Sequence, residues 1–261
     1  MSRSAKPQGQ GAARPHAGST ANRGSDPAED LRALEAAARA LGLVLTETQL
    51  RSLLDYGALL RKWNAVYNLT AIRDPRAMLV QHLFDCLAIV PALRAAPVGM
   101  AGTGPGESAE VPGRDLLADG AVVLDVGSGG GLPGVVLAIC APGVQVHCVD
   151  TVGKKAAFIT QVRAELGLAN LHAIHARVED LQAPRDLPAP TLIVSRAFSS
   201  LALFVSLTRH LLAPGGLWAA MKGQLPHDEL AELPDPVSLS ATITLAVPQL
   251  DAQRHLLLLA A

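Results

Sequence analysis

The sequence predicts an α/β protein, with a doubly wound, mostly parallel sheet preceded by a small helical extension. Three observations support this fold class. Short apolar runs alternate with helical stretches from residue 121 onward, a glycine-rich turn follows the first of these runs, and helix-start signals recur before residue 92. Such alternation is typical of parallel sheets covered by helices on both faces, whose ligands bind at the carboxyl ends of the strands.

Composition limits the class of protein. The chain has 261 residues and is 49% hydrophobic, enough for one catalytic domain and a smaller attachment. No uninterrupted apolar run approaches the roughly 20 residues of a membrane span, so we expect no membrane association. The sequence does not indicate an oligomeric state, and a monomer is the default expectation. Because the formal net charge is −1, a nucleic-acid partner must be held by a local patch. Cys86, Cys140 and Cys148 lie in apolar segments without metal-ligand spacing, which indicates reduced core residues of a cytoplasmic protein and no metal site.

Four segments divide the chain. Residues 1–25 are rich in Gly, Ser, Ala and Pro and predict a disordered tail. Residues 26–94 form the helical region, and residues 95–120, with many Gly and Pro, predict a flexible linker or loop. The α/β domain occupies residues 121–261.

Three helix starts define the helical region. Asp26 and Asp74 each precede a proline, which pairs an N-cap residue with a proline in the first helical position. Thr46 and Gln49 have the spacing of a capping box. We therefore expect three helices, the first ending near Gly42.

The α/β domain is expected to contain seven strands. Five of them should be parallel, and helices should connect them. The expected strands are 121–126, 144–149, 171–175, 191–195 and 216–221, and the expected helices are 132–141, 153–166, 199–212 and 226–232. The last two apolar runs, Leu239 to Val247 and Arg254 to Leu259, are separated by a short break and predict an antiparallel hairpin that closes the sheet.

The most informative segment runs from Asp125 to Gly134. It follows a buried strand, contains a turn almost free of side chains, and leads into a helix. Glycines allow a ligand to approach bare backbone, and the helix start offers unpaired N–H groups. We expect a small molecule to bind over this turn.

Two ligands compete for the turn. Its glycines have the G-x-G-x-x-G spacing of a dinucleotide-binding loop, with Asp150 placed for ribose hydroxyls: Gly129, Gly131 and Gly134. Asp125 and Gly127, however, belong to an Asp-Val-Gly-Ser-Gly run typical of the first motif of class I S-adenosylmethionine methyltransferases. A carboxylate suits the positive amino-acid end of that cofactor better than a pyrophosphate, so the sulfonium cofactor is favoured.

A family resemblance extends from about Leu31 to Glu232. The chain resembles the bacterial 16S ribosomal RNA guanine-N7 methyltransferases, once called glucose-inhibited division protein B. The segments that carry it are Trp63 to Pro75, His82 to Cys86, Asp125 to Gly134, Gly153 to Lys155, Arg177 to Glu179, Ser195 to Phe198, and Lys222 to Gln224. The combination is specific to the family, whereas the glycine turn alone identifies only the superfamily.

The resemblance implies a class I methyltransferase fold, S-adenosylmethionine as cofactor, and one guanine in the decoding region of 16S rRNA in the small ribosomal subunit as substrate. The expected cofactor-binding residues are Gly127, Gly129, Leu132, Asp150, Val178, Glu179 and Arg196. The expected RNA-binding residues are Asn68, Arg73, Phe198 and Lys222. Phe198 could instead fill the core.

The chemistry needs no general base, because guanine N7 has a free lone pair and no proton to remove. Placing the methyl group and N7 in line is the main requirement, with Arg196 and Lys222 as candidate positioning residues. We expect His82 to be structural rather than catalytic. Trp63, Asn64 and Tyr67 could either pack the helix end or contact RNA or cofactor.

Two other functions stay open at this point. An NAD-dependent oxidoreductase would fit the glycine spacing, although no acid–base pair for hydride transfer is evident. A non-catalytic ribosome-assembly factor that binds S-adenosylmethionine would share the cofactor site but transfer no methyl group.

Overall fold

The structure is a computed structural model that describes residues 26–97 and 113–261. The predicted tail and residues 98–112 of the predicted linker lie outside the described residues. Of the remaining linker, Ala96 and Arg114 form an isolated antiparallel bridge. This bridge connects the end of the helical region to the start of the α/β domain.

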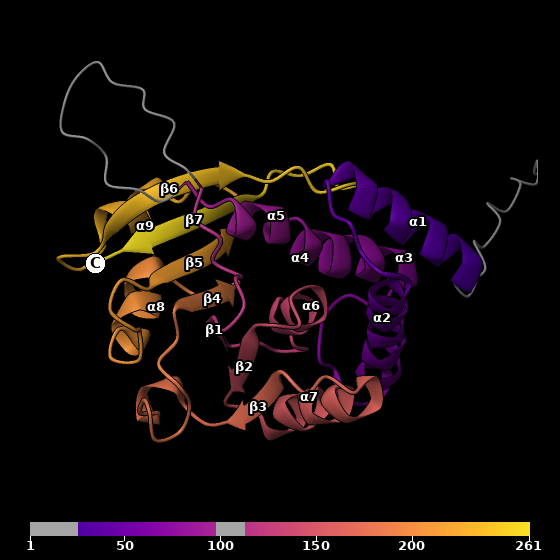
Figure 1. The fold of residues 1–261 in the computed structure, drawn as a ribbon, viewed down its shortest axis with the longest axis horizontal. Helices are drawn as coiled ribbons and strands as arrows, with labels where there is room; N and C mark the ends of the chain where they lie inside the picture. Colours follow the sequence, from indigo (N-terminus) through magenta and orange to yellow (C-terminus); the bar gives the residue numbers. More distant parts are fainter. Residues whose placement is uncertain (1–25, 98–112) are drawn as a thin grey trace, which may run out of the picture.

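A seven-stranded sheet forms the centre of the molecule (Figure 1). The strand order is β3-β2-β1-β4-β5-β7-β6, and only the pairs that include β7 are antiparallel. The strands are β1 (Val122–Val126), β2 (Gln145–Asp150), β3 (Leu171–His175), β4 (Leu192–Arg196), β5 (Leu217–Lys222), β6 (Ser238–Thr244) and β7 (His255–Ala260). The predicted fold class, the five parallel strands and the closing hairpin are confirmed.

Helices cover both faces of the sheet (Figure 1). One face carries α6 (Gly134–Cys140) and α7 (Gly153–Leu166), which in turn pack against α2 (Glu47–Tyr67). The other carries α8 (Leu201–Thr208), the 3-10 turn η2 (Val178–Asp180) and α9 (His227–Ala231). Each face has its own apolar cluster of buried side chains. The predicted helices are therefore confirmed, with ends that differ by a few residues.

The predicted helix starts are also confirmed. The carboxylate of Asp26 accepts from the backbone N–H of Ala28 and begins α1 (Pro27–Ala40). Thr46 and Gln49 form both hydrogen bonds of a capping box at the start of α2. Each cap accepts from a backbone N–H that the first helical turn leaves unpaired. It thereby stabilises the helix by about 1 kcal/mol.

The third helical segment is one continuous run with a π-helical centre. It consists of α3 (Pro75–Met78), the π-helix η1 (Leu79–Phe84), α4 (Asp85–Leu87) and α5 (Ile89–Arg94). Its length and composition would suffice to cross a membrane, yet 72% of its most apolar window is buried inside the protein. It is thus a core helix, and its π-helical turn rotates the side chains that follow, as is frequent at functional sites.

Helix α2 packs directly on the glycine turn. The buried hydroxyl of Tyr56 donates to the carbonyl of Gly130 at 2.6 Å. A Cβ at Gly130 would lie 2.9 Å from a side-chain methyl of Leu60, so the Leu60 side chain packs directly on the bare backbone of Gly130. The helices of residues 27–94 and one face of the sheet share a single apolar cluster. The helical region therefore shapes the ligand-binding edge of the sheet.

Candidate functional site

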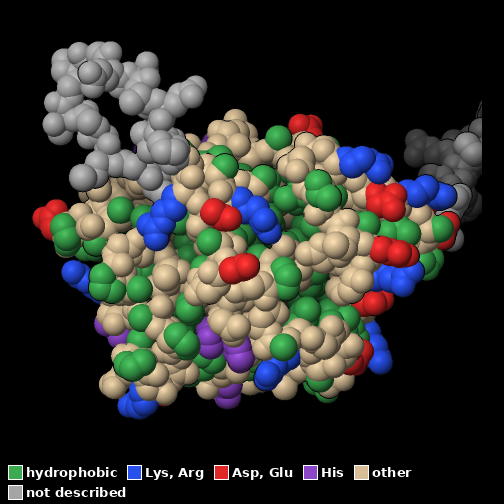
Figure 2. All heavy atoms as spheres, in the orientation of Figure 1, with side chains coloured by type: hydrophobic (Ala, Val, Ile, Leu, Met, Phe, Trp, Pro, Cys, Tyr) green, Lys and Arg blue, Asp and Glu red, His purple; other side chains and the backbone are tan. Residues whose placement is uncertain are grey.

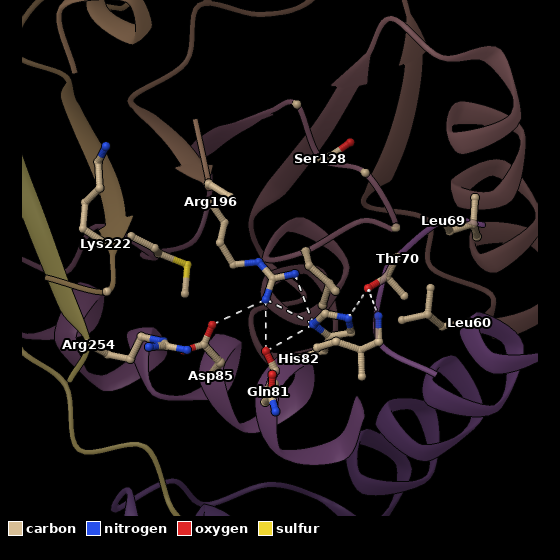
Figure 3. A pocket seen from close by; sticks show the side chains of 18 residues that line it. Leu60, Leu69, Thr70, Gln81, His82, Asp85, Ser128, Arg196, Lys222 and Arg254 are labelled. Carbon is tan, nitrogen blue, oxygen red and sulfur yellow. Dashed lines mark hydrogen bonds and ion pairs between the residues drawn. The ribbon is translucent and has the colours of Figure 1, made fainter. Parts of the chain in front are cut away.

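A cleft of about 480 Å³ opens at the carboxyl ends of the central strands. It lies between the glycine turn, the ends of β4 and β5, the loop between α2 and α3, and the π-helical segment (Figure 3). The charged and polar side chains on its walls are Thr70, His82, Asp85, Arg196, Lys222 and Arg254. Its volume is within the range of small-molecule sites.

A second pocket of about 370 Å³ shares Gly127 with this cleft. Its lining combines the apolar Val178 and Phe198 with the carboxylates of Asp150 and Glu179, which pair with Lys155 and Arg177 of the same pocket. Two pockets that meet at one glycine can hold one elongated ligand bent around the turn.

The five glycines of the turn have different tasks. Gly127 and Gly129 adopt φ values of +67° and +59°, which side chains rarely tolerate. A Cβ at Gly131 would lie 2.5 Å from Val135, and one at Gly134 would lie 2.4 Å from the sulfur of Cys148. Gly131 and Gly134 are thus required by packing, whereas Gly127, Gly129 and Gly130 border the pockets.

Asp125 does not contact the pockets, which corrects our expectation for this carboxylate. It is fully buried beneath the turn, where Oδ2 accepts from the N–H of Gly134 at 2.8 Å. Oδ1 has no hydrogen-bond partner among the residues that the structure describes. Burial raises the pKa of Asp125 from 3.8 to about 7, although the N–H of Gly134 and the charge of Arg196 act in the opposite direction.

The same contact corrects the expectation of free N–H groups at the start of α6. The N–H of Gly134 is bonded to Asp125, and that of Val135 donates to the carbonyl of Gly131. At the start of α6 a pyrophosphate would meet backbone N–H groups that already donate hydrogen bonds, with the carboxylate of Asp125 beneath them. The loop therefore lacks the usual reason for anion binding at a helix N-terminus.

Arg196 is the central side chain of the cleft (Figure 3). From the end of β4 its guanidinium reaches the π-helical segment, where it donates to the carbonyl of Gln81 at 3.1 Å and pairs with Asp85 at 3.4 Å. Its neighbour Ala197 has φ +60°, a strained value for a residue with a side chain. This turn places Arg196 in the cleft and Phe198 in the second pocket.

His82 has a structural environment, in agreement with our expectation. Its ring nitrogens contact the hydroxyl of Thr70 at 2.8 Å and the guanidinium of Arg196 at 3.3 Å. Burial, with a further contribution from the charge of Arg196, lowers the pKa of His82 from 6.5 to about 4. The imidazole is therefore neutral near pH 7.

Lys222 lines the cleft from the end of β5 but is already paired. Its Nζ contacts both carboxylate oxygens of Glu229 in α9, at 2.7 and 2.9 Å. In Figure 3 its side chain extends away from Arg196. The two candidate positioning residues thus border the same cleft without contacting each other.

The other expected cofactor residues lie around the two pockets. Leu132 and Gly129 border the cleft, and Val178 and Glu179 border the second pocket. Asp150 borders the second pocket too, while its carboxylate accepts from the N–H groups of Gly129 and Val152 at 2.9 Å. It therefore braces the glycine turn from the side.

The expected RNA-binding residues are not brought together. Phe198 packs 5.5 Å from Phe204 and faces the second pocket with the expected cofactor residues, rather than the cleft with Lys222. Asn68 and Arg73 are exposed on the loop beside the cleft, and the guanidinium of Arg73 donates to Asn68 at 2.7 Å.

Of the three residues with open alternatives, two are clearly structural. Asn64 is buried and bonds the carbonyl of Ile72 and the N–H of Thr70, which fixes the loop after α2. Trp63 packs against Phe158 and Tyr67 at centroid distances of 5.4 and 5.1 Å. Tyr67 remains partly exposed.

Asp85 and Arg254 are site residues that the sequence analysis missed. Asp85 is almost fully buried, and its two oxygens pair with Arg196 and with Arg254, the latter at 2.9 Å. The two partners lie 111 and 169 residues away along the chain, so no local pattern could connect them. The only sequence signal was a charged residue within an apolar helix.

Comparisons with known proteins were made over the whole chain. Residues 49–257 match the family described as rRNA small subunit methyltransferase G, GidB. A protein named ribosomal RNA small subunit methyltransferase G from Acidovorax sp. (strain JS42) is 55% identical over 86% of this chain and 92% of its own length. Proteins of the same name from Burkholderia cenocepacia (strain HI2424) and Burkholderia pseudomallei (strain 668) are 56% and 52% identical, over 83% and 88% of this chain and 86% and 90% of their own lengths.

The buried Asp125 predicts an unusual dependence of stability on pH. Because its pKa is higher in the folded protein than the ordinary value of 3.8, its contribution is complete below about pH 4 and is lost as the pH rises through about 7. Asp125→Asn abolishes this loss. We expect the stability of the variant relative to wild type to rise between pH 4.5 and 7.5, by at most about 4 kcal/mol.

Denaturant unfolding of both proteins at several pH values measures this difference. Histidine contributions, which run in the opposite direction, are common to both proteins and cancel. Parallel stability curves for wild type and variant would contradict the raised pKa.

Proposed function

The chain belongs to the rRNA small subunit methyltransferase G family, and we propose that it transfers a methyl group from S-adenosylmethionine to N7 of one guanine in 16S rRNA. The observation that carries the proposal is the pair of pockets that meet at Gly127. One pocket suits a nucleoside and the other has room for an amino-acid group together with a reacting base.

The residues around the second pocket fit an adenosyl group. Val178 and Phe198 provide apolar surface for a purine, and the carboxylates of Asp150 and Glu179 suit hydroxyl and amino donors. Gly127 has no side chain to block passage between the two pockets. A Cβ there would point toward Phe198 of the second pocket, at 3.9 Å.

The cleft fits the amino-acid end of the same cofactor. Arg196 offers a cationic group for its carboxylate, and Leu132 with Gly129 forms the adjoining wall. We assign Arg196 as the carboxylate-binding residue.

The residues of the cleft bind and orient, and none has to move a proton. The cofactor supplies an electrophilic methyl group, whose bond to sulfur breaks as the bond to N7 forms. Guanine N7 has no proton to lose, and His82 is already neutral and hydrogen-bonded. Correct placement in a site that excludes water can supply roughly 7–11 kcal/mol of the barrier reduction.

The ion pairs of the cleft reduce its electrostatic repulsion of the positively charged product. The methylated guanine carries a positive charge, which unpaired cations nearby would repel. Arg196 and Arg254 share the carboxylate of Asp85, and Lys222 is paired with Glu229. The pairs leave one cation in excess, which matches the single carboxylate of the cofactor.

The oxidoreductase alternative is not supported by the local geometry. The start of α6 is capped from below by Asp125, and two of the three glycines in the dinucleotide spacing serve packing. The assembly-factor alternative shares the cofactor site and differs only in chemistry. Transfer of labelled methyl groups separates it from the proposed function.

The substrate implies the place of action. We propose the small ribosomal subunit as the partner and the cytoplasm as the compartment. The three cysteines support a reducing compartment, because all of them are buried and free.

Mapping of small-subunit rRNA modifications by mass spectrometry tests the function directly. RNA from cells with and without this protein is compared, and we expect one N7-methylguanine to depend on it. Purified protein should restore that mark on unmodified small subunits with labelled S-adenosylmethionine. An unchanged modification pattern would refute the proposal.

Gly127→Val is expected to abolish binding of S-adenosylhomocysteine, because the new side chain projects into the junction of the pockets. Gly42→Val is the matched control: Gly42 has nearly the same φ (+68°) but nothing within 4 Å of its Cβ position. Both variants carry the same backbone strain, so isothermal titration reports the pocket alone. Equal affinities in the two variants would contradict the placement of the cofactor.

Arg196→Gln should weaken binding of S-adenosylhomocysteine by at least about tenfold, the effect of losing one charge-assisted hydrogen bond. Binding of the decarboxylated analogue should be nearly unchanged, because that ligand lacks the group we assign to Arg196. Lys222→Gln, which alters a cation already paired with Glu229, serves as the control for charge. Equal losses for both ligands would show that Arg196 does not bind the carboxylate.

A further inference from the structure

Helices α2 and α7 lie side by side and run in opposite directions. Thr46, Gln49 and Ser52 at the start of α2 line one pocket together with residues 166–170 at the end of α7. Nearer the other ends, Trp63 contacts Phe158 at a centroid distance of 5.4 Å. The end of α2 and the start of α7 therefore form one corner of the molecule.

An aromatic ring is held at this corner with part of its surface free. Tyr67 is one helical turn beyond Trp63 and packs against it at 5.1 Å, yet its side chain is 42% exposed. The adjacent Val66 is 69% exposed. Because Trp63 is itself wedged against Phe158, the ring of Tyr67 is fixed before any partner arrives.

Two cations flank the ring. Lys154 lies one turn before Phe158, so the antiparallel packing places it level with Tyr67. It is exposed and forms no ion pair with any residue of segments 26–97 and 113–261. On the other side, Arg73 is hydrogen-bonded to Asn68, the residue that ends α2 in a left-handed conformation.

We propose that this corner, made of Val66, Tyr67, Asn68, Arg73 and Lys154, binds unpaired bases of the rRNA beside the methylated guanine. The inference rests on the proposed function and names the surface that function requires. Tyr67 stacks on a base, and Arg73 and Lys154 bind the adjoining phosphates.

The corner continues into the cleft. Asn68 is followed directly by Leu69 and Thr70, and these two residues and Ile72 line the cleft wall. RNA held on Tyr67 is thus one loop away from Arg196. A base can enter the cleft while its neighbours remain stacked outside.

Charge favours RNA over a protein partner. The chain carries a net charge of −1, and Figure 2 shows Lys and Arg side chains mixed with acidic ones over the face it presents. A polyanion therefore needs a local site. The corner supplies two cations. One exposed acid, Asp74, follows Arg73 in the chain, and its carboxylate caps α3.

The test compares variants of the corner with variants of α8 and its C-cap in methylation of small ribosomal subunits. Tyr67→Ala and Lys154→Ala alter the corner, whereas Leu203→Ala removes a comparably exposed apolar side chain from α8 and Arg209→Ala removes an exposed cation from its C-cap. Steady-state kinetics gives KM for the subunits and kcat, filter binding gives the affinity for subunits, and titration gives the affinity for S-adenosylhomocysteine.

We expect Tyr67→Ala to raise KM and weaken subunit binding by about tenfold, with unchanged affinity for S-adenosylhomocysteine and little change in kcat. Lys154→Ala should weaken subunit binding by a few fold and reduce the slope of log affinity against log salt by about one. Tyr67→Phe, which keeps the ring, should behave like wild type, as should Leu203→Ala and Arg209→Ala.

Wild-type methylation with unchanged KM and subunit binding in both corner variants would overturn the inference and leave the proposed function intact. A wild-type protein that methylates no small-subunit RNA would instead refute the proposed function. Parallel losses of subunit and S-adenosylhomocysteine binding in Tyr67→Ala, with no salt effect in Lys154→Ala, would show that the corner has only a structural role.

Discussion

The rest of the site depends on the fixed shape of the glycine turn after β1. This turn has almost no side chains, and besides its own backbone hydrogen bonds, polar groups from three directions hold it. Asp125 bonds Gly134 from below, Asp150 bonds Gly129 from the side, and Tyr56 bonds Gly130 from α2. Each anchor is buried, so a broken bond would leave a polar group without water, at about 1–3 kcal/mol. The turn is therefore a rigid edge around which a ligand must bend.

The cleft beside that edge combines strong charges with a small net charge. A site that binds a carboxylate and produces a cationic base needs a cation that is firmly held but compensated. Asp85 meets both requirements for Arg196, since it is buried, shared with Arg254, and located where the π-helical turn presents it to β4. A carboxylate shared by two guanidinium groups also fixes their orientation, because each takes one oxygen. The contact of Asp85 with the two arginines thus both compensates their charge and fixes their position.

Local patterns predicted most of the fold, since strand alternation, the capping box at Thr46 and the proline-led helix starts depend on neighbouring residues. They also singled out Gly127, which follows β1 directly, and Arg196, which is the last residue of β4. What they missed depends on distant contacts. The burial of Asp125 is decided by the packing of Cys148 and Gly134, the pairing of Asp85 joins segments 169 residues apart, and the π-helical segment has no distinct sequence pattern. Phe198 was assigned to RNA because a free aromatic residue suits a base, but the turn at Ala197 directs it to the second pocket.

The helical region acts as part of the catalytic edge. In a parallel sheet the carboxyl ends of the strands supply ligands from one side only, and the opposite wall has to come from elsewhere. Here α2 and the π-helical segment form that wall. Tyr56 and Asp85 contact residues of the α/β domain directly, and Thr70 contacts His82, which in turn contacts Arg196. The loop between α2 and α3 lines the cleft on its inner side and carries Asn68 and Arg73 on its outer side. The proposed cofactor site and the proposed RNA surface therefore share one short segment, so a shift of α2 would affect both.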